Sequence, residues 1–345
     1  MTRRIMILVY PGCMALDIVG PSDTFLMANT VVREHSGQSA EAAYDVSLVA
    51  PTLGSLKTAG SIITINVDRR CEDVTDAELD DTDLVLVSGG VSAIDIRTDP
   101  GMLDFINRAY GRANRIGSIC TGAFLLAEAG IIGGRKAATH WRKAKVLQEA
   151  YPDVEVEPAS IVCKDGNVWT SGGITSGIDL ALSIVEEDLG PEIARSVARL
   201  MVTHMARRGG QNQYEDIDLD APTRVGAADV VMQEILIYIR VHPTRDLRLE
   251  TLAEQFNLTE KTLARHFKSF SGRTIGKYVE EVRLVHAQAR LENSGESLSE
   301  IARSSGFPSN EALRRAFSKR FSITPAEFRA RFRTAAEQVQ RPAAE

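Results

Sequence analysis

The sequence predicts a two-domain protein in which an α/β domain with a parallel sheet precedes an all-α domain with two helix-turn-helix motifs. Three observations predict this fold. Short runs of Val, Ile and Leu alternate with longer helical patterns over residues 1–208. A polar stretch without strand or helix periodicity follows at residues 209–228. The last hundred residues then repeat one helical pattern with a period of 49 to 50 residues, the signature of a duplicated unit.

The length and composition agree with two globular domains. The chain has 345 residues, of which 44% are hydrophobic and 25% are charged. No apolar run is long enough to cross a membrane, and Pro11 ends the N-terminal run, which favours a buried strand over a secretion signal. The four cysteines and six histidines have no disulfide-framework or metal-ligand spacing. We therefore expect a cytoplasmic protein with reduced thiols, no cofactor, no metal and no membrane partner.

The first domain is expected at residues 1–208. Ile5–Val9, Tyr44–Ala50 and Asp83–Val87 are short runs rich in Val, Ile and Leu, and longer helical patterns separate several of them. This alternation is typical of a parallel sheet with helices on both faces, the flavodoxin-like α/β arrangement. Ligands of such folds bind at the carboxyl ends of the strands, so the residues that follow the strands are the candidates for function.

Three strand ends carry candidate site residues. Cys120 follows a strand that begins at Ile116 and precedes a helix, so it should lie at an abrupt turn. Gly89 and Gly90 end another strand, where their backbone N–H groups can approach a ligand, and Asp17 follows the first strand. The helix after Cys120 should lower the pKa of the thiol, whereas a charged Asp17 should raise it. The direction of the shift therefore stays open.

The first domain resembles the glutamine amidotransferase-like superfamily that includes PfpI-type proteases and isocyanide hydratases. The residues that carry the resemblance cover nearly all of residues 3–205 and are Leu16–Pro21, Gly89-Gly90, Cys120–Ala123, Thr139–Trp141 and Thr170–Asp179. The resemblance implies that Cys120 occupies a strained elbow, that Asp17 is the acidic side chain in contact with it, and that His140 lies near the cysteine.

One departure from the proteases is informative. They have a histidine directly after the cysteine, where this chain has Thr121, so a protease mechanism is disfavoured. The Cys-Thr-Gly sequence with an aspartate is the arrangement of isocyanide hydratases, and it also occurs in regulators of GlxA type, whose domain is thought to sense rather than catalyse. Each residue also has a structural alternative: Cys120 as a small buried side chain, Asp17 as the cap of the helix that follows, and His140 as a hydrogen-bonding partner.

Residues 209–228 are expected to form the linker, because they are polar and lack periodicity. The second domain is expected at residues 229–335, with its first helix near Val230–Ile239, and residues 336–345 are expected to be a flexible tail.

Two copies of a helix-turn-helix motif follow. In the first copy Leu249–Phe256 places apolar residues on one helix face, Asn257 suits a left-handed turn, and Thr259 is positioned to cap a second helix. The second copy repeats this pattern about 50 positions later, with its turn at Gly306 and its cap at Ser309. A helical run at residues 279–291 should join the copies and fix the spacing of their second helices, roughly one DNA turn of 34 Å.

The second helix of each copy should expose short polar and basic side chains. Such a helix, placed after a tight turn, suits the major groove of double-stranded DNA, where Arg pairs with guanine and Lys or Ser holds phosphates. The sequence predicts DNA contacts from Thr259, Lys261, Thr262, Arg265, His266 and Lys268 of the first copy, and from Ser309, Asn310, Arg314, Arg315 and Lys319 of the second. We expect Lys261 and Arg314 to lie nearest the middle of the exposed faces.

The charge is distributed unevenly along the chain. Residues 241–335 contain 17 Lys or Arg and 11 Asp or Glu, a net charge of +6, whereas the whole chain carries −6. The remainder of the chain therefore carries −12. A basic module on an acidic protein is the asymmetry expected of a DNA-binding end.

The second domain resembles the AraC/XylS family of bacterial transcription regulators. The stretch from Gly306 to Pro325 matches the signature of that family, and the resemblance covers about residues 229–335. Ser322 replaces a common glycine, and Ile275 replaces a proline, but neither position lies on the predicted DNA face.

Together the two resemblances imply a bacterial transcription regulator of GlxA type. We expect the second domain to bind double-stranded promoter DNA, and the first domain to bind a small-molecule effector and form a homodimer. The alternative is an enzyme, a cysteine-dependent hydratase or hydrolase that carries a DNA-binding module.

Overall fold

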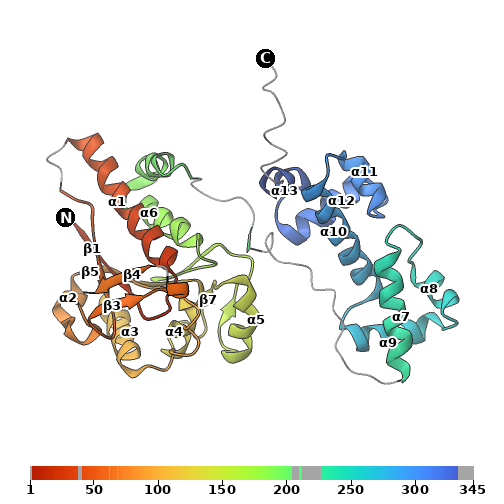
Figure 1. The fold of residues 1–345 in the computed structure, drawn as a ribbon, viewed down its shortest axis with the longest axis horizontal. Helices are drawn as coiled ribbons and strands as arrows, with labels where there is room; N and C mark the ends of the chain where they lie inside the picture. Colours follow the sequence, from red (N-terminus) through yellow and green to blue (C-terminus); the bar gives the residue numbers. More distant parts are fainter. Residues whose placement is uncertain are drawn as a thin grey trace, which may run out of the picture. The chain divides into compact units, whose positions relative to one another are not determined.

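The computed structural model describes residues 2–37, 41–61, 63–67, 69–203, 210–211 and 227–332. The chain divides into two compact units, Met1–Asn212 and Gln213–Glu345, and each is described by itself (Figure 1). The division falls within the predicted linker at residues 209–228. Most of that stretch, and the whole predicted tail at residues 336–345, lies outside the described residues.

A six-stranded sheet forms the centre of the first unit. Its strands follow the order β2-β1-β5-β6-β10-β9, and all neighbours are parallel except β10 and β9. The strands are β1 (Arg3–Leu8), β2 (Tyr44–Val49), β5 (Thr82–Val87), β6 (Arg115–Ile119), β9 (Val162–Asp165) and β10 (Val168–Ser171). The three strands predicted from runs of Val, Ile and Leu are confirmed as β1, β2 and β5. Their apolar runs are continuous because helices cover both faces of the sheet.

The helices and small sheets of the first unit surround this central sheet. The helices are α1 (Ala15–Ser36), α2 (Asp76–Asp80), α3 (Pro100–Arg112), α4 (Ala123–Glu128), α5 (Trp141–Ala150) and α6 (Ser176–Leu200), and the single 3-10 turns are η1 (Ala59–Ser61), η2 (Cys71–Asp73) and η3 (Cys120–Gly122). Two short sheets pair β3 (Gly54–Lys57) with β4 (Thr64–Val67) and β7 (Lys136–Ala137) with β8 (Glu155–Val156). In Figure 1, α1 and α6 lie together on one side of the central sheet, and α3 and α4 lie on the other.

A buried ion network lies at the start of β6. Arg115 is 5% exposed, and its guanidinium lies 2.9 Å from Asp188 of α6 and also contacts Asp83 of β5. The Tyr44 hydroxyl of β2 donates a 2.9 Å hydrogen bond to the same Asp188. One arginine therefore joins two strands and a helix. Buried charges are tolerated only when they are paired in this way.

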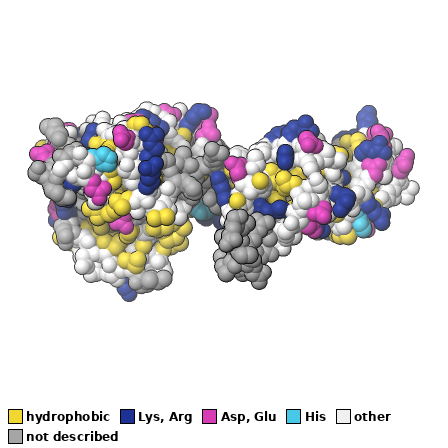
Figure 2. All heavy atoms as spheres, turned by 90° about the horizontal axis from the view of Figure 1, so that it is seen from above, with side chains coloured by type: hydrophobic (Ala, Val, Ile, Leu, Met, Phe, Trp, Pro, Cys, Tyr) yellow, Lys and Arg dark blue, Asp and Glu magenta, His cyan; other side chains and the backbone are white. Residues whose placement is uncertain are grey.

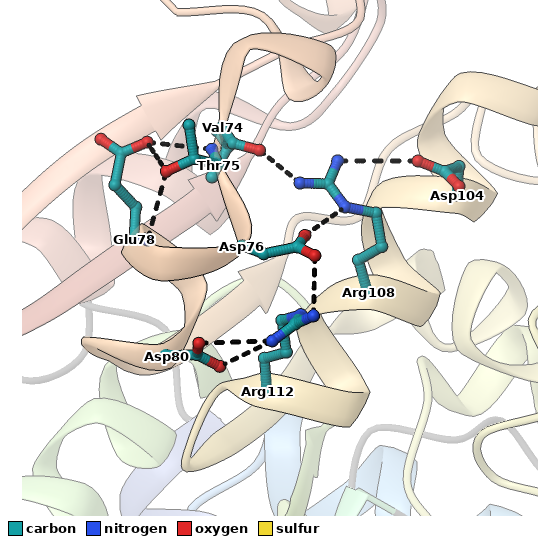
Figure 3. Close-up of polar contacts among 8 residues, drawn as sticks. All are labelled: Val74, Thr75, Asp76, Glu78, Asp80, Asp104, Arg108 and Arg112. Atoms are coloured by element: carbon teal, nitrogen blue, oxygen red, sulfur yellow. Dashed lines mark hydrogen bonds and ion pairs between the residues drawn. The ribbon is translucent and has the colours of Figure 1, made fainter.

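A second ion network lies on the surface and holds α2 against α3. Arg108 and Arg112 of α3 bond the Asp76 carboxylate at 3.1 and 2.7 Å, and Arg112 also bonds Asp80 (Figure 3). Thr75 caps α2 through a capping box. The partners are solvent-exposed, so each of these ion pairs should contribute only about 0–1 kcal/mol to the stability of the unit.

Helices are the only secondary structure among the described residues of the second unit. Its helices are α7 (Ala227–Val241), α8 (Leu249–Gln255), α9 (Glu260–Ser271), α10 (Ile275–Asn293), α11 (Leu298–Ser304), α12 (Asn310–Phe321) and α13 (Pro325–Phe332). The two predicted helix-turn-helix motifs are confirmed as α8 with α9 and α11 with α12. The joining helix predicted at residues 279–291 is α10, which extends a few residues further at both ends.

Each motif has a hydrophobic core of its own. The first core contains Leu263 and Phe267, and the second contains Leu313 and Phe317, as the apolar spacing predicted. Helix α10 contributes side chains to both cores. Neither core includes a residue of the first unit, so the packing that stabilises the second unit is internal to it.

Left-handed backbone conformations end the helices of both motifs. The turns between the paired helices contain Asn257 at φ 52° and Gly306 at φ 83°. The second helices end at Gly272 with φ 71° and at Ser322 with φ 59°. Ser322 therefore occupies the left-handed position where glycine is common in the family, although this conformation is unfavourable for a residue with a Cβ atom.

Candidate functional site

Cys120 lies at a sharp turn directly after β6. Its φ of 56° is left-handed, which is uncommon for a residue other than glycine, and its side chain is 7% exposed. The turn is tightly packed, because a Cβ atom at Gly122 would lie 2.5 Å from the Val87 carbonyl oxygen. The predicted elbow is therefore present, at the carboxyl end of the sheet.

Asp17 lies in the first turn of α1 and is completely buried. The N-cap of α1 is Met14, which makes no side-chain capping bond, so the alternative in which Asp17 caps the helix is wrong. Instead, Asp17 Oδ2 accepts a 2.9 Å hydrogen bond from the Gly89 N–H, while Oδ1 has no hydrogen-bond partner among the described residues. Burial raises the pKa of Asp17 to about 7, so near neutral pH a large fraction carries a proton that can be donated.

The Cys120 thiol is protonated at neutral pH. Burial, and to a smaller extent the nearby Asp17, raise its pKa to about 11, although the Ile174 and Thr121 backbone N–H groups oppose the shift. The expected lowering by the following helix is therefore outweighed. Helix α4 has only six residues and begins three positions after Cys120, so the field of its N-terminus at the sulfur is weak.

The two glycines after β5 make close contacts within the elbow. A Cβ atom at Gly89 would lie 2.7 Å from both Asp17 Oδ2 and the Cys120 Cβ atom. The Gly89 N–H donates to Asp17, and the Gly90 N–H donates to Thr121 Oγ1 at 2.9 Å, while the Thr121 hydroxyl donates back to the Gly90 carbonyl oxygen. Both N–H groups therefore bond protein side chains, whereas the sequence suggested that they approach a ligand.

His140 lies beside Gly173, in the loop between β10 and α6. It is the N-cap of α5, where Nδ1 accepts a hydrogen bond from the Arg142 N–H, so the neutral ring carries its proton on Nε2. Burial lowers the pKa of His140, and the charges of Arg142 and Lys143 lower it further. A Cβ atom at Gly173 would lie 2.8 Å from the His140 ring. The His140 ring therefore packs against Gly173.

Thr139 and Gln211 belong to the same cluster, although neither was among the predicted site residues. The buried Thr139 hydroxyl donates a 2.7 Å hydrogen bond to the Cys120 carbonyl oxygen. Gln211, in the stretch predicted as linker, is buried against the first unit. Thr139 was noted only as part of the Thr139–Trp141 match, and no local pattern marked Gln211, because its partners are far away in the sequence.

The predicted DNA-binding side chains lie on α9 and α12 or at their caps. Thr259 caps α9 and Ser309 caps α12, as predicted. The basic side chains of both helices are exposed, namely Lys261, Arg265 and Lys268 on α9, and Arg314, Arg315 and Lys319 on α12. Thr262, His266 and Asn310 are half-buried, and Asn310 donates to Ser299 Oγ at 2.8 Å.

The exposed middle of α12 differs from the prediction. Leu313 and Phe317 face the core, and each residue turns the helix by about 100°. Arg315 therefore points almost directly away from the core, whereas Arg314 lies on the flank, so the prediction for Arg314 was wrong. On α9, Lys261 lies near the middle, as predicted, together with Arg265.

A groove separates the two motifs within the second unit. Helix α9 contributes Ala264 and Lys268, helix α12 contributes Arg315 and Lys319, and Arg283 lies at its base on α10. In Figure 2, Lys and Arg side chains are interspersed with acidic ones on the visible face of the molecule. The second helices thus border a groove that is lined by five basic and three acidic side chains.

No cluster of His, Cys, Asp and Glu suited to a metal ion occurs among the described residues. No helix in the described part of the chain is long and apolar enough to cross a membrane.

Comparisons with known proteins identify both units. Residues 3–187 match the family model for the DJ-1/PfpI family, and residues 252–331 match that for a helix-turn-helix domain. The HTH-type transcriptional regulator GbdR of Pseudomonas aeruginosa is 26% identical over 247 residues, covering 72% of this chain and 66% of that protein. The HTH-type transcriptional regulator GlxA of Rhizobium meliloti is 31% identical over 217 residues, covering 63% and 65%. The chain thus spans about two thirds of the length of these relatives.

Two more comparisons concern mainly the first unit. The isonitrile hydratase of Pseudomonas putida is 37% identical over 116 residues, which cover 33% of this chain and 49% of that enzyme. A crystal structure of a THiJ/PfpI family protein from Pseudomonas syringae has a TM-score of 0.50 at 22% identity, covering 69% of this chain and 86% of that one. This likeness indicates a common fold.

Proposed function

Because this chain belongs to the DJ-1/PfpI family and joins that domain to an AraC-type helix-turn-helix domain, we propose that it is a transcription regulator. The second unit binds promoter DNA through α9 and α12. The first unit binds a small effector at the elbow and forms a homodimer. The observation that carries the proposal is the pair of capped helices that expose basic side chains beside one groove. The relatives named as transcription regulators support it.

Genome-wide mapping of the sites bound by the full chain tests the proposal. Enrichment of a recurring promoter sequence is the expected result, and that sequence then serves as the operator in the binding measurements below. A full chain that enriches no sequence above background would contradict the proposal.

Arg315→Ala should weaken operator binding by about 1–3 kcal/mol while binding to random DNA changes much less. The reason is its place in the middle of the exposed face of α12, where a side chain can reach base edges. Lys261→Ala should behave in the same way on α9. Titrations of the full chain with labelled operator and with random DNA measure both affinities.

Arg314→Ala is the matched control, because it removes the same charge from the flank of the same helix. We expect a smaller loss that is equal on operator and random DNA, as for a phosphate contact. An equal loss on both DNAs for Arg315→Ala would instead assign Arg315 to the phosphate backbone.

The elbow is proposed to sense rather than catalyse. A thiol with a pKa of about 11 is a poor nucleophile at neutral pH. Thr121 occupies the position of the protease histidine, and its hydroxyl and the Gly90 backbone bond each other. The second candidate function, a cysteine-dependent hydratase, is favoured by the partial similarity to the isonitrile hydratase.

Cys120→Ser should leave folding and operator affinity unchanged, because the elbow belongs to the first unit and serine is nearly isosteric. It should alter the response of the full chain to its effector. Thermal unfolding and operator titration measure the first two properties. Multiple turnover of a small isonitrile by the wild-type chain, lost in Cys120→Ser, would favour the hydratase.

The homodimer is proposed to form through the first unit. Leu16, Val19 and Leu26 are exposed on one side of α1, with Leu26 54% exposed. In Figure 2, hydrophobic side chains are grouped on the visible face of the first unit. An apolar helix face of this kind is typical of a protein interface. Two copies bound to repeated half-sites would also gain affinity through their effective concentration.

We expect the full chain to be dimeric at micromolar concentration and Leu26→Asp to shift it towards monomer, since a buried carboxylate would oppose the interface. Static light scattering measures the mass. Val91→Asp is the control, because Val91 is 72% exposed and lies outside α1. A wild-type chain that remains monomeric would refute the dimer.

A further inference from the structure

The Gln211 side chain fills a slot in the first unit. It is 4% exposed, and its carboxamide makes four hydrogen bonds to backbone groups. The Trp141 and Gly173 N–H groups donate to Oε1 at 3.1 and 3.3 Å. Nε2 donates to the carbonyl oxygens of Thr139 and Ser160, both at 2.8 Å. Backbone groups thus bind both lone pairs of the carboxamide oxygen and both N–H groups of its nitrogen.

The slot is complementary to a primary carboxamide in particular. Two donors converge on one atom of the group and two acceptors converge on the other. A carboxylate would place an oxygen against the carbonyl oxygens of Thr139 and Ser160. An ammonium group has no acceptor, so it would leave the backbone N–H groups of Trp141 and Gly173 without a partner. The slot exists because residue 172 is glycine: a Cβ atom there would lie 2.2 Å from Gln211 Cδ and 2.4 Å from both terminal atoms.

The slot shares its walls with the elbow. Gly173, which donates to Gln211, precedes Ile174, whose backbone N–H group lowers the pKa of the Cys120 thiol. Thr139 accepts from Gln211 through its carbonyl oxygen and donates to the Cys120 carbonyl oxygen through its hydroxyl. One short path of hydrogen bonds, through Thr139, therefore connects Gln211 with Cys120. On the other side of the slot, Gly173 is bonded to the residue whose N–H group acts on the thiol.

We propose that this slot is a carboxamide-binding site that Gln211 occupies in cis, and that a small primary carboxamide can replace the Gln211 side chain there. Gln211 lies two positions before the division between the units. Occupation of the slot by Gln211 fixes the end of the first unit beside the elbow, and an incoming carboxamide releases it. The consequence for DNA binding rests on the proposed regulator function, whereas the slot itself does not.

Chemical rescue tests the slot without DNA. Gln211→Ala in the full chain removes the carboxamide and should lower the melting temperature of the first unit by about 5–10 °C. Propionamide, which has the same terminal group, should restore about half of that loss at concentrations well above an affinity on the order of 10 mM. Propionate at equal concentration should restore nothing. In the wild type the tethered Gln211 side chain competes for the slot, so propionamide should shift the melting temperature much less than in Gln211→Ala, and propionate should not shift it at all.

The double variant Gly172→Ala/Gln211→Ala is the matched control. Its added Cβ atom fills the slot, so propionamide should no longer rescue the melting temperature. Gly172→Ala alone should be destabilising because it displaces Gln211, and it should cost much less in the Gln211→Ala background. If Gln211→Ala does not fold by itself, the refolded yield in propionamide against propionate gives the same readout. Equal effects of propionamide on the wild type, the single variant and the double variant would overturn the proposal.

Operator titration then tests the coupling. Gln211→Ala should change the operator affinity of the full chain by about fivefold or more, and propionamide at concentrations that displace Gln211 should change the wild-type affinity in the same direction. Successful rescue of the melting temperature with unchanged operator affinity would overturn the coupling while leaving the regulator function intact. A wild-type chain that does not bind the operator would refute the regulator function. The carboxamide site would then be judged by the rescue of the melting temperature alone.

Discussion

Raising the salt concentration from about 50 to 200 mM should weaken DNA binding by the fragment 229–335 by about 10²–10³-fold, for about five phosphate contacts. The fragment carries the excess of basic residues, and each neutralised phosphate releases a condensed cation into solution. The release becomes less favourable as the salt concentration rises. Fluorescence anisotropy of labelled operator over a salt series measures the slope of log affinity against log salt.

The fragment is suited to this measurement because its two hydrophobic cores contain no residue of the first unit. Lys268→Ala should reduce the slope by about one if that side chain holds a phosphate. Glu292→Ala is the control, since it removes a charge from α10 and belongs to neither α9 nor α12. A fragment with no preference for the operator at any salt concentration would contradict the central claim.

Replacing Arg115 with methionine should lower the free energy of unfolding of the first unit by about 3–5 kcal/mol. Methionine occupies a similar volume but leaves the carboxylates of Asp83 and Asp188 without their main cationic partner in a poorly solvated position. Arg3 remains 3.5 Å from Asp188 and compensates only in part. Urea unfolding of the full chain, followed by Trp fluorescence, measures the effect, because both tryptophans belong to the first unit.

Arg112→Met is the control for this prediction. Arg112 makes ion pairs of comparable length with Asp76 and Asp80, but on the surface (Figure 3). We expect a loss of at most about 1 kcal/mol, since water solvates the remaining carboxylates. Similar losses for the two variants would show that burial of the Arg115 network contributes nothing.

The structure of the elbow could be predicted from the sequence only in part. The strand, the turn and the cysteine were predicted from residue types near each other in the chain. The direction of the Cys120 pKa shift was not, because it depends on desolvation by residues from several elements. The role of Asp17 was likewise decided by the Gly89 N–H, which lies 72 positions away.

What the sequence by itself determined is the local and repeated part of this protein. The period of the two motifs, the caps at Thr259 and Ser309 and the apolar runs of the strands are properties of neighbouring residues, so they can be recognised in one dimension. Only the tertiary structure decided that the Gly89 N–H binds Asp17 and that Gln211 fills a slot near Cys120. The physical reason is that burial and hydrogen-bond partners depend on segments that the fold brings together, and Gln211 is 38 to 72 positions from the groups that bind its side chain.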